Sequence, residues 1–185
     1  MDIHRHNANA WNAESDRGDS PWCQPGGPDV IAAARRGDWS VILTPNKAVP
    51  KAWFGELAGA RVLCLAGSGG QQAPVLAAAG ADVTVLDISA AQLAKDVFVA
   101  ERDGLDLAVI EADMTRLSDH VSGAFDLIFH PISNLFIADL MPVWSQCAAV
   151  LKPGGRLLSG FVNPDFWLFD HDEIEAGGAL QVRHR

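Results

Sequence analysis

The sequence contains no long hydrophobic run. No apolar stretch among its 185 residues approaches the roughly 20 residues that a membrane-spanning helix requires. The N-terminal residues 1–15 also lack the apolar segment that forms the centre of a secretory signal. The sequence therefore predicts a protein that has no membrane partner and is not secreted.

Cysteine is scarce and basic residues are few. The three cysteines lie far apart, form no CxxC pair and are odd in number. This usage is typical of a reducing cytoplasm, where Cys64 and Cys147 would serve as small core side chains. Lysine and arginine number 14 against 23 acidic residues, giving a formal net charge of −9. Because nucleic acids bind to basic surfaces, this charge disfavours a nucleic-acid partner.

The composition is that of one globular domain, with 49% hydrophobic and 20% charged residues. From residue 61 onward the pattern alternates between strands and helices. The predicted strands cover residues 62–65, 83–86, 105–110, 125–129 and 156–162. Five strands joined by helical crossovers predict an α/β fold, namely a doubly wound, Rossmann-like, mostly parallel sheet with helices on both faces.

Two helices of this region have specific sequence signals. Ser89 and Gln92 predict a capping box, followed by an apolar stripe of Leu93, Ala94, Val97 and Phe98. The later helix is predicted to begin at Asp139 and to bury Leu140, Val143, Trp144, Cys147 and Leu151. The turn Lys152-Pro153-Gly154-Gly155 is expected to end it before the last strand.

The pattern before residue 61 is weaker. Residues 1–28 are polar and are predicted to be irregular. A short helix is expected over residues 29–36, stopped by Gly37. Residues 39–60 contain several prolines and glycines, which predicts mostly connection, with one helical turn near Trp53.

The most informative stretch joins the first two predicted strands. A buried strand leads into a glycine-rich turn, a short helix, and a second strand that ends at Asp87. Such a turn lets a ligand approach the backbone at a helix N-terminus, and the acid accepts hydrogen bonds from a ribose diol. Asp87 follows Gly67 by about 20 residues, the usual separation. The stretch therefore predicts a nucleoside-containing cofactor.

Several blocks, in this order, resemble those of class I S-adenosylmethionine-dependent methyltransferases of the small-molecule, type 11-like kind. They are residues 62–70, Asp87, residues 111–114, residues 125–129 and the LxPGGxL turn at 151–158. The resemblance covers residues 61 to about 162. It implies that the protein binds S-adenosylmethionine, releases S-adenosylhomocysteine, and methylates an unidentified small molecule.

The resemblance also implies the site and its parts. Residues 1–60 would form an N-terminal segment on the substrate side that closes over the cofactor, and residues 61–185 the Rossmann-like cofactor-binding domain. Asp87 would bind the ribose, and Asp113 with Met114 would flank the adenine. The residues expected at the cofactor are Ala66, Gly67, Ser68, Gly69, Gly70, Gln71, Asp87, Ile88, Asp113, Met114 and His130.

The first motif departs from the family pattern. Cys64 stands where the family has an acid, and Ala66 and Ser68 stand where it has glycines. Flexibility of the turn is then expected from glycines at shifted positions, Gly67, Gly69 and Gly70. Affinity would depend instead on Asp87, on backbone groups, or on Gln71 and Gln72.

Two alternatives stay open: an NAD(P)-binding Rossmann oxidoreductase, and a truncated, non-catalytic nucleotide-binding domain. The dinucleotide fingerprint GxGxxG, counted from Gly67, requires a glycine where Gln72 stands. Counted from Gly69, it fails at Gln71. The oxidoreductase therefore ranks below the methyltransferase.

Methyl transfer needs mainly alignment of the acceptor, and a base where the acceptor carries a proton. His130, at the carboxyl end of the fourth strand, is the candidate base, and the alternative is a strand cap beside Pro131. Asn134 is predicted to orient a substrate or to cap a turn, and Trp11 to contact the substrate. No metal is expected, because His4 and His6 lack a second ligand cluster.

Beyond residue 162 the sequence has little room for the antiparallel strand pair that usually ends this fold. We therefore expect a C-terminally truncated chain that lacks the full pair. Its last strand would expose an edge, which favours self-association.

Overall fold

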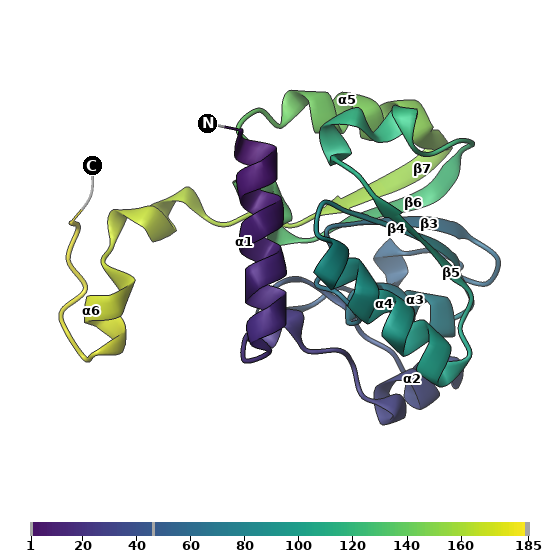
Figure 1. Cartoon of the computed structure of the whole chain (residues 1–185), viewed down its shortest axis with the longest axis horizontal. Coiled ribbons are helices and arrows are strands. Elements are labelled where there is room, and N and C mark those ends of the chain that lie inside the picture. The colour runs from purple at the N-terminus through teal and green to yellow at the C-terminus, as the bar shows by residue number, and fades with distance from the viewer. Residues whose placement is uncertain (1, 46, 184–185) are drawn as a thin grey trace.

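The computed structural model describes residues 2–45 and 47–183. Its centre is a five-stranded sheet in the order β5-β4-β3-β6-β7, and every pairing in it is parallel (Figure 1). The strands are β3 (Arg61–Leu65), β4 (Asp82–Asp87), β5 (Leu107–Glu111), β6 (Phe125–His130) and β7 (Leu151–Ser159). The strand order reverses between β3 and β6, which is where open α/β sheets bind their ligands. The predicted fold class is confirmed.

Helices cover both faces of the sheet (Figure 1). Side chains alternate along β3, so Val62 and Cys64 enter one core while Leu63 and Leu65 enter the other. The first core is covered by α2 (Pro28–Arg35), α3 (Gln72–Ala78) and α4 (Ala90–Asp103). The second is covered by α5 (Met141–Val150) and by the 3₁₀ segment η3 (Met114–Asp119).

The N-terminal region is more regular than its sequence predicts. Residues expected to be irregular form α1 (Ile3–Arg17), which Asp2 caps by accepting a hydrogen bond from the Arg5 N–H at 3.1 Å. Ser15 is the one residue of this helix that is buried. Polar contacts and cavity-lining side chains hold α1 in place, and the helix has no face that packs into the core. Its sequence therefore lacks the apolar stripe by which an amphipathic helix is predicted.

Residues 18–60 add short elements to the first core. The expected helix before Gly37 is confirmed as α2, and the helical turn near Trp53 as η2 (Lys51–Trp53). An earlier turn, η1 (Pro21–Cys23), and a hairpin of β1 (Ile42–Thr44) and β2 (Lys47–Ala48) were not predicted. These strands are too short to show a period of two. Apolar residues of this region join the core of the sheet domain, among them Ile31, Val41, Val49, Phe54 and Leu57.

The predicted apolar stripe of α4 is right for Leu93 and wrong for Ala94 and Phe98. Ala94 is exposed and Phe98 is 53% exposed, whereas the buried residues are Gln92, Leu93, Asp96, Val99 and Ala100. The helix therefore buries two polar side chains that an apolar pattern does not reveal. The capping box is half confirmed: Ser89 Oγ accepts from the Gln92 N–H at 3.2 Å, but the Gln92 side chain points elsewhere.

The boundaries around α5 also differ from expectation. The helix begins at Met141 with Leu140 as N-cap, and Asp139 accepts a hydrogen bond from the Met141 N–H. Leu151 belongs to β7 rather than to the helix. The Pro-Gly-Gly turn lies within β7 as an irregularity, between the pairs Phe125↔Leu151 and Leu127↔Arg156.

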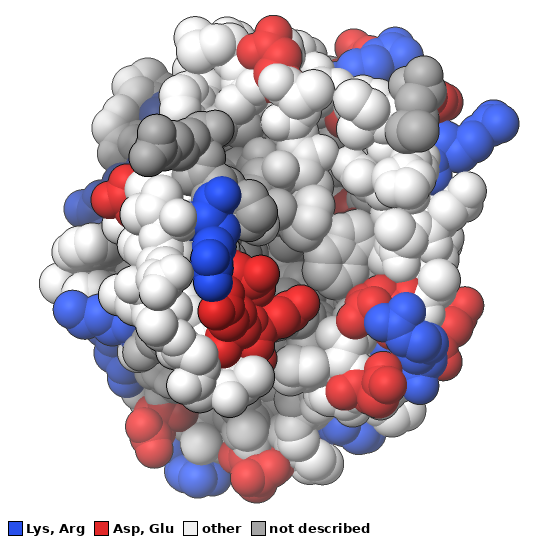
Figure 2. Space-filling model, turned by 90° about the vertical axis from the view of Figure 1, so that its left-hand side faces the viewer, with Lys and Arg blue, Asp and Glu red and all other residues white. Residues whose placement is uncertain are grey.

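After β7 the chain forms η5 (Pro164–Leu168) and α6 (His171–Glu175) in an arm that extends from the sheet (Figure 1). In its described part, through residue 183, this arm contains one antiparallel bridge, Phe169↔Val182, and no further strand of the sheet. The side of the molecule that carries it has acidic side chains gathered near the centre (Figure 2). Self-association through the β7 edge stays a prediction. In the described ranges no helix combines the length and apolarity needed to cross a membrane.

Candidate cofactor site

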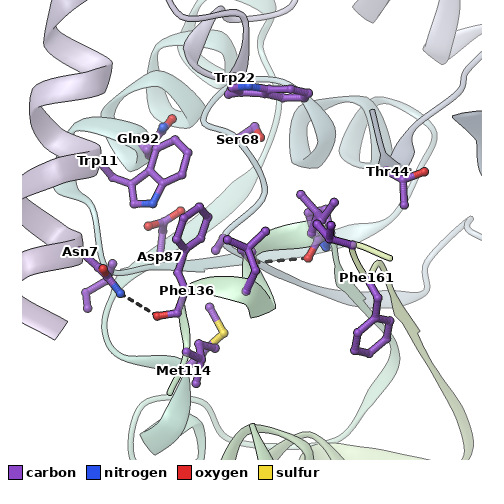
Figure 3. Close-up of a pocket in the computed structure, with 18 of the residues that line it drawn as sticks. Asn7, Trp11, Trp22, Thr44, Ser68, Asp87, Gln92, Met114, Phe136 and Phe161 are labelled. Atoms are coloured by element: carbon purple, nitrogen blue, oxygen red, sulfur yellow. Dashed lines mark hydrogen bonds between the residues drawn. The ribbon is translucent and has the colours of Figure 1, made fainter. Parts of the chain in front are cut away.

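A cavity of about 620 Å³ lies at the carboxyl ends of β3, β4, β5 and β6, and α1 forms one of its walls (Figure 3). The volume is within the range of about 300–1,000 Å³ that is usual for small-molecule sites. Residues that end the strands or follow them closely form its floor: Ala66, Ser68, Asp87, Ile88, Ala112, Asp113 and Met114. The cavity thus occupies the switch point of the sheet, as the sequence predicts.

Asp87 is the most deeply placed acid of the cavity. It ends β4, is 7% exposed, and accepts a hydrogen bond from the Ser89 N–H at 2.8 Å. Burial raises its pKa to about 6, against the lowering effect of the Ser89 and Ile88 backbone hydrogen bonds. The carboxylate therefore gains from any ligand that donates hydrogen bonds to it.

The turn after β3 has two non-glycine residues in the left-handed region, Ala66 with φ 46° and Ser68 with φ 60°. Both line the cavity. This conformation favours glycine and strains residues that carry a Cβ. The backbone therefore keeps a conformation suited to glycine although the glycines are absent.

Two side chains of α4 hold this turn from below. Gln92 Oε1 accepts from the Gly69 N–H at 2.8 Å, and Asp96 Oδ1 accepts from the Gly70 N–H at 2.8 Å. Gln92 and Asp96 are one helical turn apart, so they face the same side. A Cβ on Gly69 would lie 2.2 Å from the Gln92 carbonyl oxygen, which explains the glycine there.

Asp96 is itself buried, and this burial raises its pKa to about 7. Cys64 is fully buried in β3, and burial raises the pKa of its thiol, so this position supplies no charge. The carboxylate beneath the turn thus comes from the helix and not from the strand. Sequence reasoning missed this role, and the available signal was a polar pair at i,i+4 spacing on α4.

The comparisons with known proteins agree with this geometry. The methyltransferase domain family matches residues 63–159, a little more than half of the chain. The chain belongs to this family. It is a class I S-adenosylmethionine-dependent methyltransferase in fold and sequence, and nothing in these comparisons favours an oxidoreductase.

One relative of this methyltransferase is the uncharacterized methyltransferase YbaJ of Bacillus subtilis, 48% identical over 179 residues, covering 97% of this chain and 69% of that protein. Another is a ubiquinone biosynthesis O-methyltransferase of Nitrosococcus oceani, 32% identical over 119 residues. The match covers 61% of this chain and 49% of that relative, so the chain spans about half of its length. Magnesium protoporphyrin IX methyltransferase of Synechocystis PCC 6803, solved with S-adenosylhomocysteine, has the same fold. Its TM-score is 0.62 at 15% identity, covering all of this chain and 83% of that one.

S-adenosylmethionine is the cofactor of this methyltransferase family, and the residues present fit it. A buried acid for a diol, an open turn and the apolar walls of Ile88, Ala112 and Met114 share one cavity. The departures are Cys64, which stands in place of the acid of β3, and Ala66 and Ser68, which stand in place of glycines.

The methyltransferase cavity has an additional contact at Asp113. Asp113 Oδ1 accepts from the Thr115 N–H at 2.8 Å, and Asp113 Oδ2 pairs with His4 Nδ1 at 2.8 Å. His4 comes from α1 and also lines the cavity. The role of Asp113 at the cofactor stays a prediction. In this structure one of the two carboxylate oxygens of Asp113 is already paired with His4.

Helix α1 is docked over the methyltransferase cavity. Its Asn12 Oδ1 accepts from Ser89 Oγ at 2.7 Å and from the Ala91 N–H at 3.1 Å, capping α4. Asn7 Nδ2 donates to the Phe136 carbonyl at 2.8 Å (Figure 3). The Trp11 ring meets Phe136 edge-on, with centroids 5.3 Å apart. The first part of the segment 1–60 is therefore a helix that places Trp11 on the cavity wall, and the covering role of the whole segment stays a prediction.

Other predicted site residues lie outside the cavity lining. Gln71 Nε2 donates to the carbonyls of Pro21 and Gln24, both at 2.8 Å, and Gln72 Oε1 accepts from the Ile42 N–H at 3.0 Å. These glutamines hold the N-terminal region against the turn. The other predicted residues absent from the lining are Gly67, Gly69, Gly70, His130 and Asn134.

His130 and Asn134 are buried beside the cavity. Neither ring nitrogen of His130 has a hydrogen-bond partner in the described chain, and burial lowers its pKa to about 4. Asn134 Nδ2 donates to the Gly160 carbonyl and, at 3.4 Å, to Ser159 Oγ. Their catalytic and substrate roles stay predictions, and these surroundings favour the alternatives of a strand end and a turn cap.

Several lining residues were not identified from the sequence. They are large apolar side chains of the N-terminal region, of the segment after β6 and of the C-terminal arm: Trp22, Leu135, Phe136, Phe161, Phe166 and Trp167. Nothing in the sequence distinguishes them from core residues, because three separate segments meet only in the folded chain.

Proposed function

We propose that this chain binds S-adenosylmethionine with Asp87 on the ribose, and that the enzyme transfers the methyl group to a small-molecule acceptor. The observation that supports this best is Asp87, a nearly buried carboxylate at the end of β4 in the wall of the cavity. A buried acid is costly unless a donor meets it, and a vicinal diol offers two donors.

The other proposed contacts follow from side-chain chemistry. Met114, Ile88 and Ala112 provide apolar walls for a purine ring, and the turn at Ala66 and Ser68 faces the amino-acid part. When bound, the cofactor supplies a methyl group on a sulfonium, a very good leaving group. The chain's own contribution is to orient the acceptor and exclude water, and Trp11 with Phe136 covers the cavity for this purpose.

We further propose a cytoplasmic enzyme in which residues 1–60 cover the site and residues 61–185 bind the cofactor. The cytoplasmic location is supported by Cys23, Cys64 and Cys147, which are all free and buried. The covering role of residues 1–60 is supported by the position of Trp11, Asn7 and His4 in the cavity wall, opposite the strand ends.

Calorimetric titration with S-adenosylhomocysteine, and with NAD in parallel, tests the cofactor. S-adenosylhomocysteine should bind and raise the melting temperature, whereas NAD should do neither. Asp87→Ala should weaken S-adenosylhomocysteine at least about tenfold, because each charge-assisted bond contributes roughly 1.5–3 kcal/mol.

The matched control is Asp82→Ala, which removes an exposed carboxylate from the other end of the same strand. It should leave the affinity unchanged. Equal losses in both variants, or binding of NAD alone, would contradict the proposal.

A further inference from the structure

Large apolar side chains are unusually exposed around the cavity. Trp22, Leu135, Phe136, Phe161, Phe166 and Trp167 all line the cavity, and their exposed fractions run from 39% to 58%. Single exposed apolar residues are ordinary, but a group of this size around one cavity indicates a binding surface. Figure 3 shows Trp22 and Phe161 on different sides of the space that opens beyond Ser68.

Around these side chains the described lining offers no lysine or arginine to an anionic group. In residues 2–45 and 47–183, no lysine or arginine lines the cavity, so an anionic acceptor would lose its hydration without compensation. The lining acids are Asp87 and Asp113, and Asp113 is already paired with His4. A cationic group, in contrast, can be attracted by the faces of the aromatic rings, so the lining excludes a negative charge and not a positive one.

The aromatic walls favour a flat ligand. Trp11 meets Phe136 at an interplanar angle of 83°, and Phe166 meets Trp167 at 81° with centroids 5.2 Å apart. Such edge-to-face pairs present both ring faces and ring edges to a third ring. A few polar side chains, Thr44, Ser133 and Asn163, also line the cavity, and a small number of polar groups is what orients a ligand in an apolar site.

We propose that the acceptor of this enzyme is a flat aromatic molecule without a negative charge, bound between α1 and the C-terminal arm. The inference rests on the proposed function, because the cofactor fills the Asp87 side of the same cavity. It identifies Trp167 and Phe161 as residues that determine acceptor specificity through ring contacts.

Two probes that share one ring system test this inference: 2-naphthol and 2-naphthoate. Each is titrated calorimetrically into the protein, first alone and then with saturating S-adenosylhomocysteine. We expect 2-naphthol to bind at least about ten times more tightly than 2-naphthoate, because the carboxylate finds no partner in the lining. Tighter binding of 2-naphthoate, or no binding of 2-naphthol, would overturn the inference.

Trp167→Ala should weaken 2-naphthol by about fivefold or more, the loss of one aromatic contact and its buried area. The matched control is Trp53→Ala, since Trp53 is 54% exposed, close to the 58% of Trp167, and lies outside the cavity lining. Equal effects of the two substitutions would also overturn the inference.

Failure of the cofactor step is separable. If S-adenosylhomocysteine does not bind, the proposed function fails, while the titrations of the protein alone still decide whether the aromatic surface selects rings without a negative charge. If S-adenosylhomocysteine binds and 2-naphthol does not, only the acceptor class is wrong.

Discussion

The side chain of Asp96 accepts a hydrogen bond from the backbone N–H of Gly70 at 2.8 Å. This bond ties the middle of α4 to the turn that follows β3. The side chain of Gln92 accepts the equivalent hydrogen bond from the preceding backbone N–H, that of Gly69. The turn is therefore ordered from the helix, in a chain whose strand has Cys64 where the family has an acid.

Loss of the Asp96 bond should loosen the turn and weaken the cofactor. We expect Asp96→Ala to raise the dissociation constant of S-adenosylhomocysteine about fivefold to tenfold. A hydrogen bond to a charged group contributes roughly 1.5–3 kcal/mol, and only part of this energy affects cofactor binding, because the rest stabilises the turn in the free protein as well. Asp96→Asn keeps an acceptor oxygen and should restore most of the affinity. Calorimetry measures the affinity, and hydrogen exchange at the Gly70 amide reports the turn. Identical affinities in the two variants would contradict a positioning role.

The raised pKa of Asp96 predicts a pH dependence of stability. Its folded-state pKa is about 7, above the ordinary value for aspartate, so its contribution is present at low pH and is lost as pH rises from about 4 through 7. Asp96→Asn removes this loss, and the stability of the variant relative to wild type should therefore increase from pH 4 to pH 8. Urea denaturation at each pH checks this, with exposed Asp38→Asn as the control. If the difference in stability between Asp96→Asn and wild type did not change from pH 4 to pH 8, burial would not raise the pKa of Asp96.

The substitution Ser68→Gly should stabilise the protein. The left-handed φ of 60° strains serine, and relief of that strain outweighs the greater freedom of glycine in the unfolded chain by about 1 kcal/mol. Ala66→Gly should act in the same direction. Thermal and urea denaturation measure the gain. Ala94→Gly, at an exposed position within α4, should instead destabilise by about 1 kcal/mol, and stabilisation there as well would point to a cause other than φ.

The substitution His130→Leu distinguishes the two roles considered for His130, a catalytic base and a buried residue at the end of β6. Both ring nitrogens are buried without partners among residues 2–45 and 47–183, so His130→Leu should preserve or raise stability, most clearly at low pH. The sign follows from a pKa lowered to about 4, since stability due to the neutral ring is lost as pH falls from about 6.5 through 4. The turnover of an accepted substrate at saturation should then be unchanged. A large fall in turnover with unaltered cofactor affinity would instead support the base.

Much of the sheet domain could be predicted from the sequence alone. The strands repeat short apolar runs between turn signals, and the acid after β4 has the spacing of a ribose-binding residue, so fold class and Asp87 follow from local pattern. The departures at Ala66 and Ser68 were also visible, although their left-handed backbone was not. Helix α1 escaped prediction because it buries almost no apolar surface.

Only the tertiary structure decided what surrounds the cavity and what supports its turn. Gln92 and Asp96 interrupt the apolar face of α4, and their partners lie 23 and 26 residues away along the chain. The aromatic walls come from the N-terminal region, the segment after β6 and the C-terminal arm. A sequence records which residues are apolar or polar in each element, but a contact between distant segments depends on how the sheet orders its strands. The cofactor side of the site therefore follows from short-range spacing, and the acceptor side follows from long-range packing.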